Sequence, residues 1–249
     1  PWLVSIYGEL NIENLVAALI LARAVGLAHI FFYARKSFGF KFVVDRAIFR
    51  QFFQYGSWVS VSNIVGPLMV YGDRFLISLI IGIEKLPIYS IPQEVLQRIL
   101  VISGSYANAL LPKITILEKN SLLVMYKRTI LSFIILSVPI FLGLYLLLPY
   151  FFTVWISLSF SIEASGIASV ILIGVFFNSL AQITLTFNYA CGLTKSVAVL
   201  HLVELLFYFI LLYFLLVEFS IFGAAIAWTV RVFADLVAMN LILFNRKNI

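Results

Sequence analysis

The stretch TILSFIILSVPIFLGLYLLLPYF at 129–151 decides the fold class, because it carries no charged side chain. The hydrocarbon core of a bilayer is about 30 Å thick and needs about 20 apolar residues in an α-helix, which this stretch supplies. Other hydrophobic stretches of similar length occupy 10–33, 56–81, 86–110, 164–189, 196–217 and 221–244. The sequence therefore predicts an all-α polytopic membrane protein with about seven transmembrane helices.

The composition favours the same class. Hydrophobic residues make up 63% of the chain and charged residues 11%, against roughly 45–50% and 25% in soluble domains. The hydrophobic runs are continuous rather than alternating, which argues against a transmembrane β-barrel. Cys191 is the single cysteine, so the chain offers no thiol cluster for metal or redox chemistry. We expect neither a cofactor nor a metal centre.

The charges of the connections alternate from one crossing to the next. Segment 34–55 carries five basic residues against Asp45, and the connection after 86–110 carries four against Glu118. The connections on the other side are neutral or acidic. By the positive-inside rule, the N-terminus of this chain is periplasmic and the C-terminus cytoplasmic. The net charge of +6 then reflects membrane topology, and no nucleic-acid partner is expected.

Segment 34–55 has apolar residues at helical spacing on one face and cations on the other. Such a basic amphipathic helix lies in the membrane interface. It is interpreted as a linker between two halves of a larger bundle or as a surface anchor, and the two roles are compatible. The chain opens at Pro1 without an initiator Met or a signal-peptide pattern, so we expect part of a longer protein.

Short turns and prolines predict the path of the chain. A turn at 82–85 should join 56–81 and 86–110 in a tight helical hairpin, and a second tight turn is expected at 218–220. Gly66-Pro67 is expected to break the helix at 56–81 near its middle, since proline removes a backbone hydrogen bond.

Ionisable residues inside the spans indicate function. Each costs roughly 2.5–3.5 kcal/mol at membrane depth, so such residues usually face a bundle interior or a wet cavity. The pattern favours a transport pathway over a simple anchor. The residues are Arg23, Asp73, Arg74, Glu94, Arg98, His201, Glu204, Arg231 and Asp235.

Helical spacing predicts some pairs among these groups. Glu94 and Arg98 share a helix face, as do Arg231 and Asp235, and such pairs can also be packing devices. Arg23 has no acid within one helical turn, which indicates an anion from another helix or a substrate phosphate.

Other polar groups leave two roles open. Asp73 and Arg74 point about 100° apart, so at least one of them needs a partner elsewhere. His201 and Glu204, three residues apart, can relay protons or simply share a hydrogen bond. A further set can line a cavity or hold helices together, namely Asn63, Asn178, Gln182 and Asn188. Enzyme motifs such as a P-loop, HExxH or a nucleophile elbow are absent from the sequence, so no enzyme is predicted.

Two stretches, 53–82 and 86–115, resemble the bacterial O-antigen and polysaccharide-unit flippases. These Wzx-type proteins belong to the multidrug/oligosaccharidyl-lipid/polysaccharide exporter superfamily. The resemblance is carried by Gly56-Ser57-Trp58, Asp73-Arg74-Phe75, Tyr89-Ser90-Ile91-Pro92 with Glu94, and Leu111-Pro112.

The resemblance implies a fold of two six-helix lobes around a central cavity, as in MATE-like transporters. On that template, 1–33 is the last transmembrane helix of the first lobe. Segment 34–55 is the cytoplasmic amphipathic linker helix, and 56–249 is the six-helix C-terminal lobe.

The resemblance also implies a function. Such a protein moves an undecaprenyl-pyrophosphate-linked oligosaccharide across the bacterial inner membrane, driven by a proton or sodium gradient. Its partners would be membrane lipids, a polysaccharide polymerase and a chain-length regulator. The implied substrate pathway comprises Asp73, Arg74, Glu94, Arg98, Arg23, Arg231 and Asn63. The implied ion-coupling residues are Asp73, Glu94, His201, Glu204 and Asp235.

Two other functions are weighed against the flippase. A drug/cation antiporter of the same fold should present an acidic, aromatic-rich cavity, whereas a flippase should present more cations than acids and a lateral opening. Acids and bases are nearly balanced inside the spans, so the motifs at 53–115 favour the flippase. A membrane-embedded sugar polymerase would need a large outer loop, and the longest outer connection predicted here is 152–163.

Overall fold

The computed structural model describes residues 12–38 and 46–245. These residues are almost entirely helical and include no strand. As predicted, the chain is an all-α polytopic membrane protein. Long apolar helices suited to crossing a membrane cover Ile12–Tyr33, Ile48–Ile80, Ser121–Trp155, Leu158–Ala190 and Thr194–Phe244.

The chain divides into two compact units, 1–50 and 51–249. The first unit contains α2 (Ile12–Phe38), whose membrane-length segment has no buried residue. The predicted linker helix at 34–55 falls partly on 39–45, which lie outside the described residues. Helix α3 (Arg46–Ile80) runs without interruption across the predicted boundary at 55/56. The division into a first-lobe helix, a linker and a C-terminal lobe stays a prediction.

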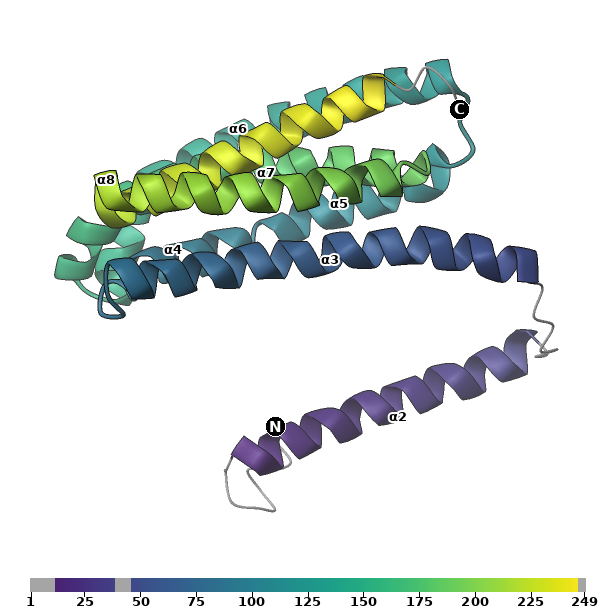
Figure 1. Cartoon of the computed structure of the whole chain (residues 1–249), viewed down its shortest axis with the longest axis horizontal. Coiled ribbons are helices and arrows are strands. Elements are labelled where there is room, and N and C mark those ends of the chain that lie inside the picture. The colour runs from purple at the N-terminus through teal and green to yellow at the C-terminus, as the bar shows by residue number, and fades with distance from the viewer. Residues whose placement is uncertain (1–11, 39–45, 246–249) are drawn as a thin grey trace. The chain divides into compact units, whose positions relative to one another are not determined.

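The second unit is a helical bundle built around α7 (Leu158–Ala190), which packs against the four other helices that follow α3 (Figure 1). They are α4 (Leu86–Gln97), α5 (Leu100–Ile114), α6 (Lys119–Trp155) and α8 (Thr194–Phe244). Small side chains allow the close contact with α8. A Cβ atom on Gly174 would collide with the ring of Trp228, so glycine at this position sets the spacing of the two helices.

Helix α8 is a hairpin rather than one long rod. Ser220 is non-helical (φ 54°, ψ −145°) at the predicted turn, and the C-terminal half of α8 runs back beside the first half (Figure 1). A Cβ atom on Gly223 would collide with the backbone carbonyl of Leu215. Only glycine permits the two halves to approach this closely.

The hairpin between α3 and α4 has the predicted turn. Gly82 adopts φ 112°, a conformation that side-chain-bearing residues rarely take, and its N–H donates to the carbonyl of Ile77 at 3.2 Å. This turn brings the faces of α3 and α4 together and so positions the charged residues on them.

The predicted break at Gly66-Pro67 is wrong, because α3 continues through Pro67 as one helix. Proline removes a single backbone bond, and the surrounding turns of α3 keep their own bonds. The chain breaks instead at 98–99, between α4 and α5. There Arg98 N–H donates to Val95 and Ile99 N–H to Leu96, a tight i→i+3 pattern.

The connections are shorter than the hydropathy pattern predicted. Helix α6 ends at Trp155 and α7 begins at Leu158. The outer connection predicted at 152–163 is therefore mostly helical, since helices extend beyond the hydrocarbon-length runs. Within the described range, no outer loop is large enough for the catalytic domain of the polymerase hypothesis.

Candidate substrate and ion site

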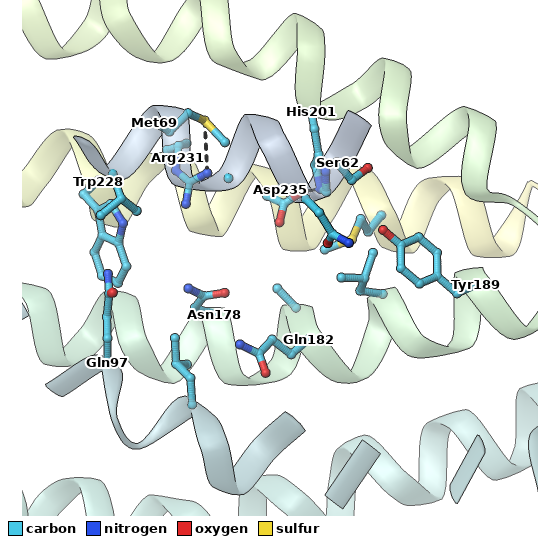
Figure 2. A pocket seen from close by; sticks show the side chains of 17 residues that line it. Ser62, Met69, Gln97, Asn178, Gln182, Tyr189, His201, Trp228, Arg231 and Asp235 are labelled. Carbon is cyan, nitrogen blue, oxygen red and sulfur yellow. Dashed lines mark hydrogen bonds and ion pairs between the residues drawn. The ribbon is translucent and has the colours of Figure 1, made fainter. Parts of the chain in front are cut away.

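A pocket of about 250 Å³ lies inside the second unit, between α3, the α4–α5 break, α7 and α8 (Figure 2). Its amide lining comes from Asn63, Gln97, Asn178 and Gln182. Figure 2 shows Asn178 and Gln182 pointing from α7 toward the side of the pocket that holds Arg231 and Asp235. Amides offer both donors and acceptors, so this wall suits a ligand rich in hydroxyl groups.

The ionisable groups that line the pocket, together with Glu204 behind them, form two pairs across the α8 hairpin. Arg231 Nη1 lies 3.9 Å from Glu204 Oε2, and His201 Nε2 lies 3.5 Å from Asp235 Oδ1. All four side chains are between 9% and 13% exposed. The face-sharing of Arg231 and Asp235 predicted an intrahelical pair, but the partner of each lies on the opposite half of α8.

These pairs leave several polar atoms unsatisfied. Both carboxylate oxygens of Glu204, Oδ1 of Asp235 and Nε of Arg231 are buried without a hydrogen bond. A native structure rarely leaves such groups unpaired unless water, an ion or a ligand completes them. This cluster of ionisable groups therefore has unused binding capacity beside the pocket.

Arg231 is held loosely by weak contacts. Its guanidinium lies 5.5 Å from the ring centroid of Tyr208, and Nη1 donates to the sulfur of Met69 at 3.3 Å. Guanidinium groups bind phosphate through two parallel hydrogen bonds. Neither of these contacts has that bidentate geometry, and the 3.9 Å ion pair with Glu204 does not have it either. The cation is therefore positioned for an anionic ligand.

A cation is the other ligand that this cluster can hold. One ligand atom each of His201, Glu204 and Asp235 lies within 4.8 Å of the others. Imidazole and carboxylate ligands suit several cations, and the same groups exchange protons. The positive charge of Arg231 beside Glu204 favours protons or a monovalent ion over a divalent metal.

Asp73 belongs to a second site and does not line the pocket. Its side chain is fully buried, and Oδ2 accepts hydrogen bonds from Tyr89 (2.9 Å), Tyr208 (3.2 Å) and Gln93 (3.4 Å). The other oxygen, Oδ1, has no hydrogen bond. Asp73 thereby ties α3 to α4 and α8, and its predicted role in transport stays a prediction.

Arg74 and Glu94 form an ion pair at 2.8 Å, with side chains 22% and 56% exposed. Asp73 and Arg74 thus have different partners, as predicted. The helix-face spacing of Glu94 and Arg98 does not yield a pair. Arg98 is exposed at the helix break and forms no ion pair within the described residues.

We expect Glu94→Gln to lower the free energy of unfolding by less than about 1 kcal/mol, because a half-exposed pair is screened by its surroundings. Titration of the purified protein with dodecyl sulfate measures this quantity. Lys85→Gln, which removes the exposed pair with Glu163 at 2.9 Å, is the matched control. A loss above about 2 kcal/mol for Glu94→Gln would contradict a weak surface-type pair.

The other predicted pathway residues have different surroundings. Arg23 is exposed on α2 in the first unit, so its role stays a prediction. Asn188 does not line the pocket: its amide donates to the carbonyl of Met239 at 3.1 Å and joins α7 to α8.

The sequence did not single out Gln93, Tyr208 or the amide of Gln97, and it named Tyr89 only as part of a motif. Tyr89 and Gln93 are four residues apart on one face of α4, and Tyr208 follows Glu204 by the same interval. Polar groups at i, i+4 on an apolar helix are a signal that would have indicated a shared buried partner.

Residues 2–118 match the family model described as polysaccharide biosynthesis protein. The chain is also 34% identical, over 237 residues, to a curated Shigella flexneri protein that carries the provisional name O-antigen transporter. The match covers 93% of this chain and 56% of that relative, so the chain spans little more than half of its length. No solved structure matches the chain. Both sequence findings confirm the resemblance carried by the motifs at 56–115, which relates this chain to polysaccharide biosynthesis proteins and to a protein named as an O-antigen transporter.

Proposed function

We propose that this chain is part of a flippase that moves a polyprenyl-pyrophosphate-linked oligosaccharide across the bacterial inner membrane. The observation that carries this proposal is the pocket of the second unit, which Arg231 lines together with the amides of Asn178 and Gln182. A guanidinium binds phosphate oxygens and amides bind sugar hydroxyls. The family match and the O-antigen transporter name of the relative support the same substrate class.

The pocket also supports coupling to an ion gradient. Glu204 lies 3.9 Å from Arg231 and would compete with a substrate phosphate for it. When a proton or Na⁺ neutralises Glu204, Arg231 becomes free to bind an anion. When the ion leaves, Glu204 pairs with Arg231 again and the anion is released. The state of Glu204 would therefore control whether Arg231 is available to the substrate.

The excess of cations that a flippase cavity predicts is not seen in this pocket. Its charged lining is Arg231 and Asp235 with His201 beside them, which is close to neutral. A drug/cation antiporter therefore stays the alternative. A nearly neutral pocket is nevertheless compatible with the proposed coupling. In the absence of the bound ion, the carboxylates offset the charge of Arg231.

The orientation follows from the basic connections. The positive-inside rule places the basic connections on the cytoplasmic side. The helices that line the pocket would then cross the membrane between the two sides.

The test is complementation of a flippase-deficient strain with the full-length gene. At matched protein levels, Arg231→Gln should lower surface polysaccharide at least about tenfold, the loss expected when one charge-assisted contact to phosphate disappears. Arg231→Lys should retain part of the activity, and Lys85→Gln should retain all of it.

Normal polysaccharide with Arg231→Gln would contradict the proposal. So would efflux of cationic dyes by the unaltered protein that Glu204→Gln abolishes, since that result identifies the antiporter.

A further inference from the structure

The second unit has a separate groove of about 630 Å³ between α5 and α6. Both helices pack against α7, which leaves space between them. Nine residues line the groove, and none of the ionisable groups described above is among them. Its lining combines two cations with hydroxyl groups and apolar side chains, which is unusual for a surface meant only to face acyl chains.

The cations come from opposite walls. Lys113 lies in the last turn of α5, and Arg128 lies on α6. Both side chains are exposed, and neither forms an ion pair with an acid in the described part of the chain. No acidic residue is among the described residues that line this groove. The charge of the groove is therefore uncompensated.

Hydroxyl groups line the groove together with the cations. Ser121 lies two turns before Arg128 on the same face of α6, whereas Thr129 is the next residue and points about 100° away from Arg128. At the inner end, the hydroxyls of Tyr106 and Ser132 share a hydrogen bond of 3.1 Å, which closes the groove. From Ser121 to Ser132 the groove follows α6 for about 16 Å.

The depth of the groove matches a lipid headgroup. The predicted hydrophobic runs end at 110 and resume at 129, so Lys113 and Arg128 lie just outside them, where phosphates of the leaflet lie. Val124, Leu117 and Met125 provide apolar lining beside the cations. Basic pockets between transmembrane helices at this level bind acidic headgroups.

We propose that the groove between α5 and α6 binds the phosphate of an anionic phospholipid from the basic, cytoplasmic side of the membrane. Lys113 and Arg128 hold the phosphate, and the hydroxyls hold the glycerol headgroup. The acyl chains leave along the apolar lining. This site is independent of the transported substrate.

Native mass spectrometry of the full chain in detergent, titrated with dioleoyl phosphatidylglycerol, tests the site. Arg128→Gln should weaken the tightest lipid-binding step about fivefold, and Lys113→Gln with Arg128→Gln about 25-fold. Arg128→Lys should stay within about twofold of the unaltered chain, because the charge is kept.

The matched control is Lys127→Gln. Lys127 is the exposed neighbour of Arg128 on α6 and does not line the groove, so its loss should change the affinity less than about twofold. Equal losses for Lys127→Gln and Arg128→Gln would overturn the proposal, since they would mean general attraction to a basic surface.

Two further outcomes would also overturn it. One is binding of dioleoyl phosphatidylcholine as tightly as phosphatidylglycerol. The other is displacement of the lipid by millimolar inorganic phosphate, which would identify a free-phosphate site instead. Circular dichroism of each variant establishes that the helices are retained.

Discussion

Arg231→Met is expected to lower the free energy of unfolding by about 3–5 kcal/mol, the usual result of removing one partner from a buried ion pair. Glu204 is 9% exposed, and neither of its carboxylate oxygens has a hydrogen bond. Without Arg231 the charge of Glu204 would lose the guanidinium that lies 3.9 Å from its Oε2. Titration with dodecyl sulfate of the protein reconstituted in mixed micelles measures the loss.

A double variant separates the contribution of Arg231 to stability from its contribution to transport. Arg231→Met combined with Glu204→Gln should recover most of the lost stability, because no uncompensated charge remains. Polysaccharide export should stay defective, since the proposed phosphate ligand is still missing. Recovery of export in the double variant would show that Arg231 serves the packing of α8 and not the substrate.

Asp73→Ala is expected to cost about 2–4 kcal/mol of unfolding free energy, because it removes the shared acceptor of Tyr89, Gln93 and Tyr208. Each buried donor left unsatisfied costs about 1–3 kcal/mol. The total stays below the sum because Gln93 can still donate to the hydroxyl of Tyr89, at 2.9 Å. The same detergent titration measures this effect.

Asp73→Asn is the informative control for that experiment. Its side-chain oxygen can accept the same bonds, so its cost should be less than half that of Asp73→Ala. If Asp73→Asn folds normally and abolishes export, Asp73 acts through its charge, as the family resemblance implies. If it exports normally, Asp73 is a structural tie between α3, α4 and α8. An equal loss of stability in both variants would contradict the hydrogen-bonding explanation.

The fold class followed from the sequence because hydrophobicity at membrane depth leaves few alternatives. A run such as 129–151 must satisfy its backbone bonds internally, and a helix does so without any partner. The turns at 82–85 and 218–220 were also predictable, since short polar or glycine-containing segments between such runs leave room only for a tight reversal. The structure places Gly82 and Ser220 at those reversals.

Helix breaks were less predictable. Pro67 is a strong local signal, but α3 tolerates it. The break at 98–99 has no glycine or proline beside it, and it coincides with the positions where Gln97 and Leu100 line the pocket. The local sequence therefore does not account for this break.

The sequence predicted that charged residues should meet inside the bundle, because lipid excludes unpaired ions. The groups on α8 do so, whereas Arg98 is exposed and forms no ion pair within the described residues. Only the tertiary structure decided which groups meet: Arg74 with Glu94, Arg231 with Glu204 and His201 with Asp235. Spacing along one helix describes neighbours on that helix alone. The hairpins at Gly82 and Ser220 place a neighbouring helical segment against each charged residue. That neighbouring segment, and not the next turn of the same helix, supplies the ion-pair partner.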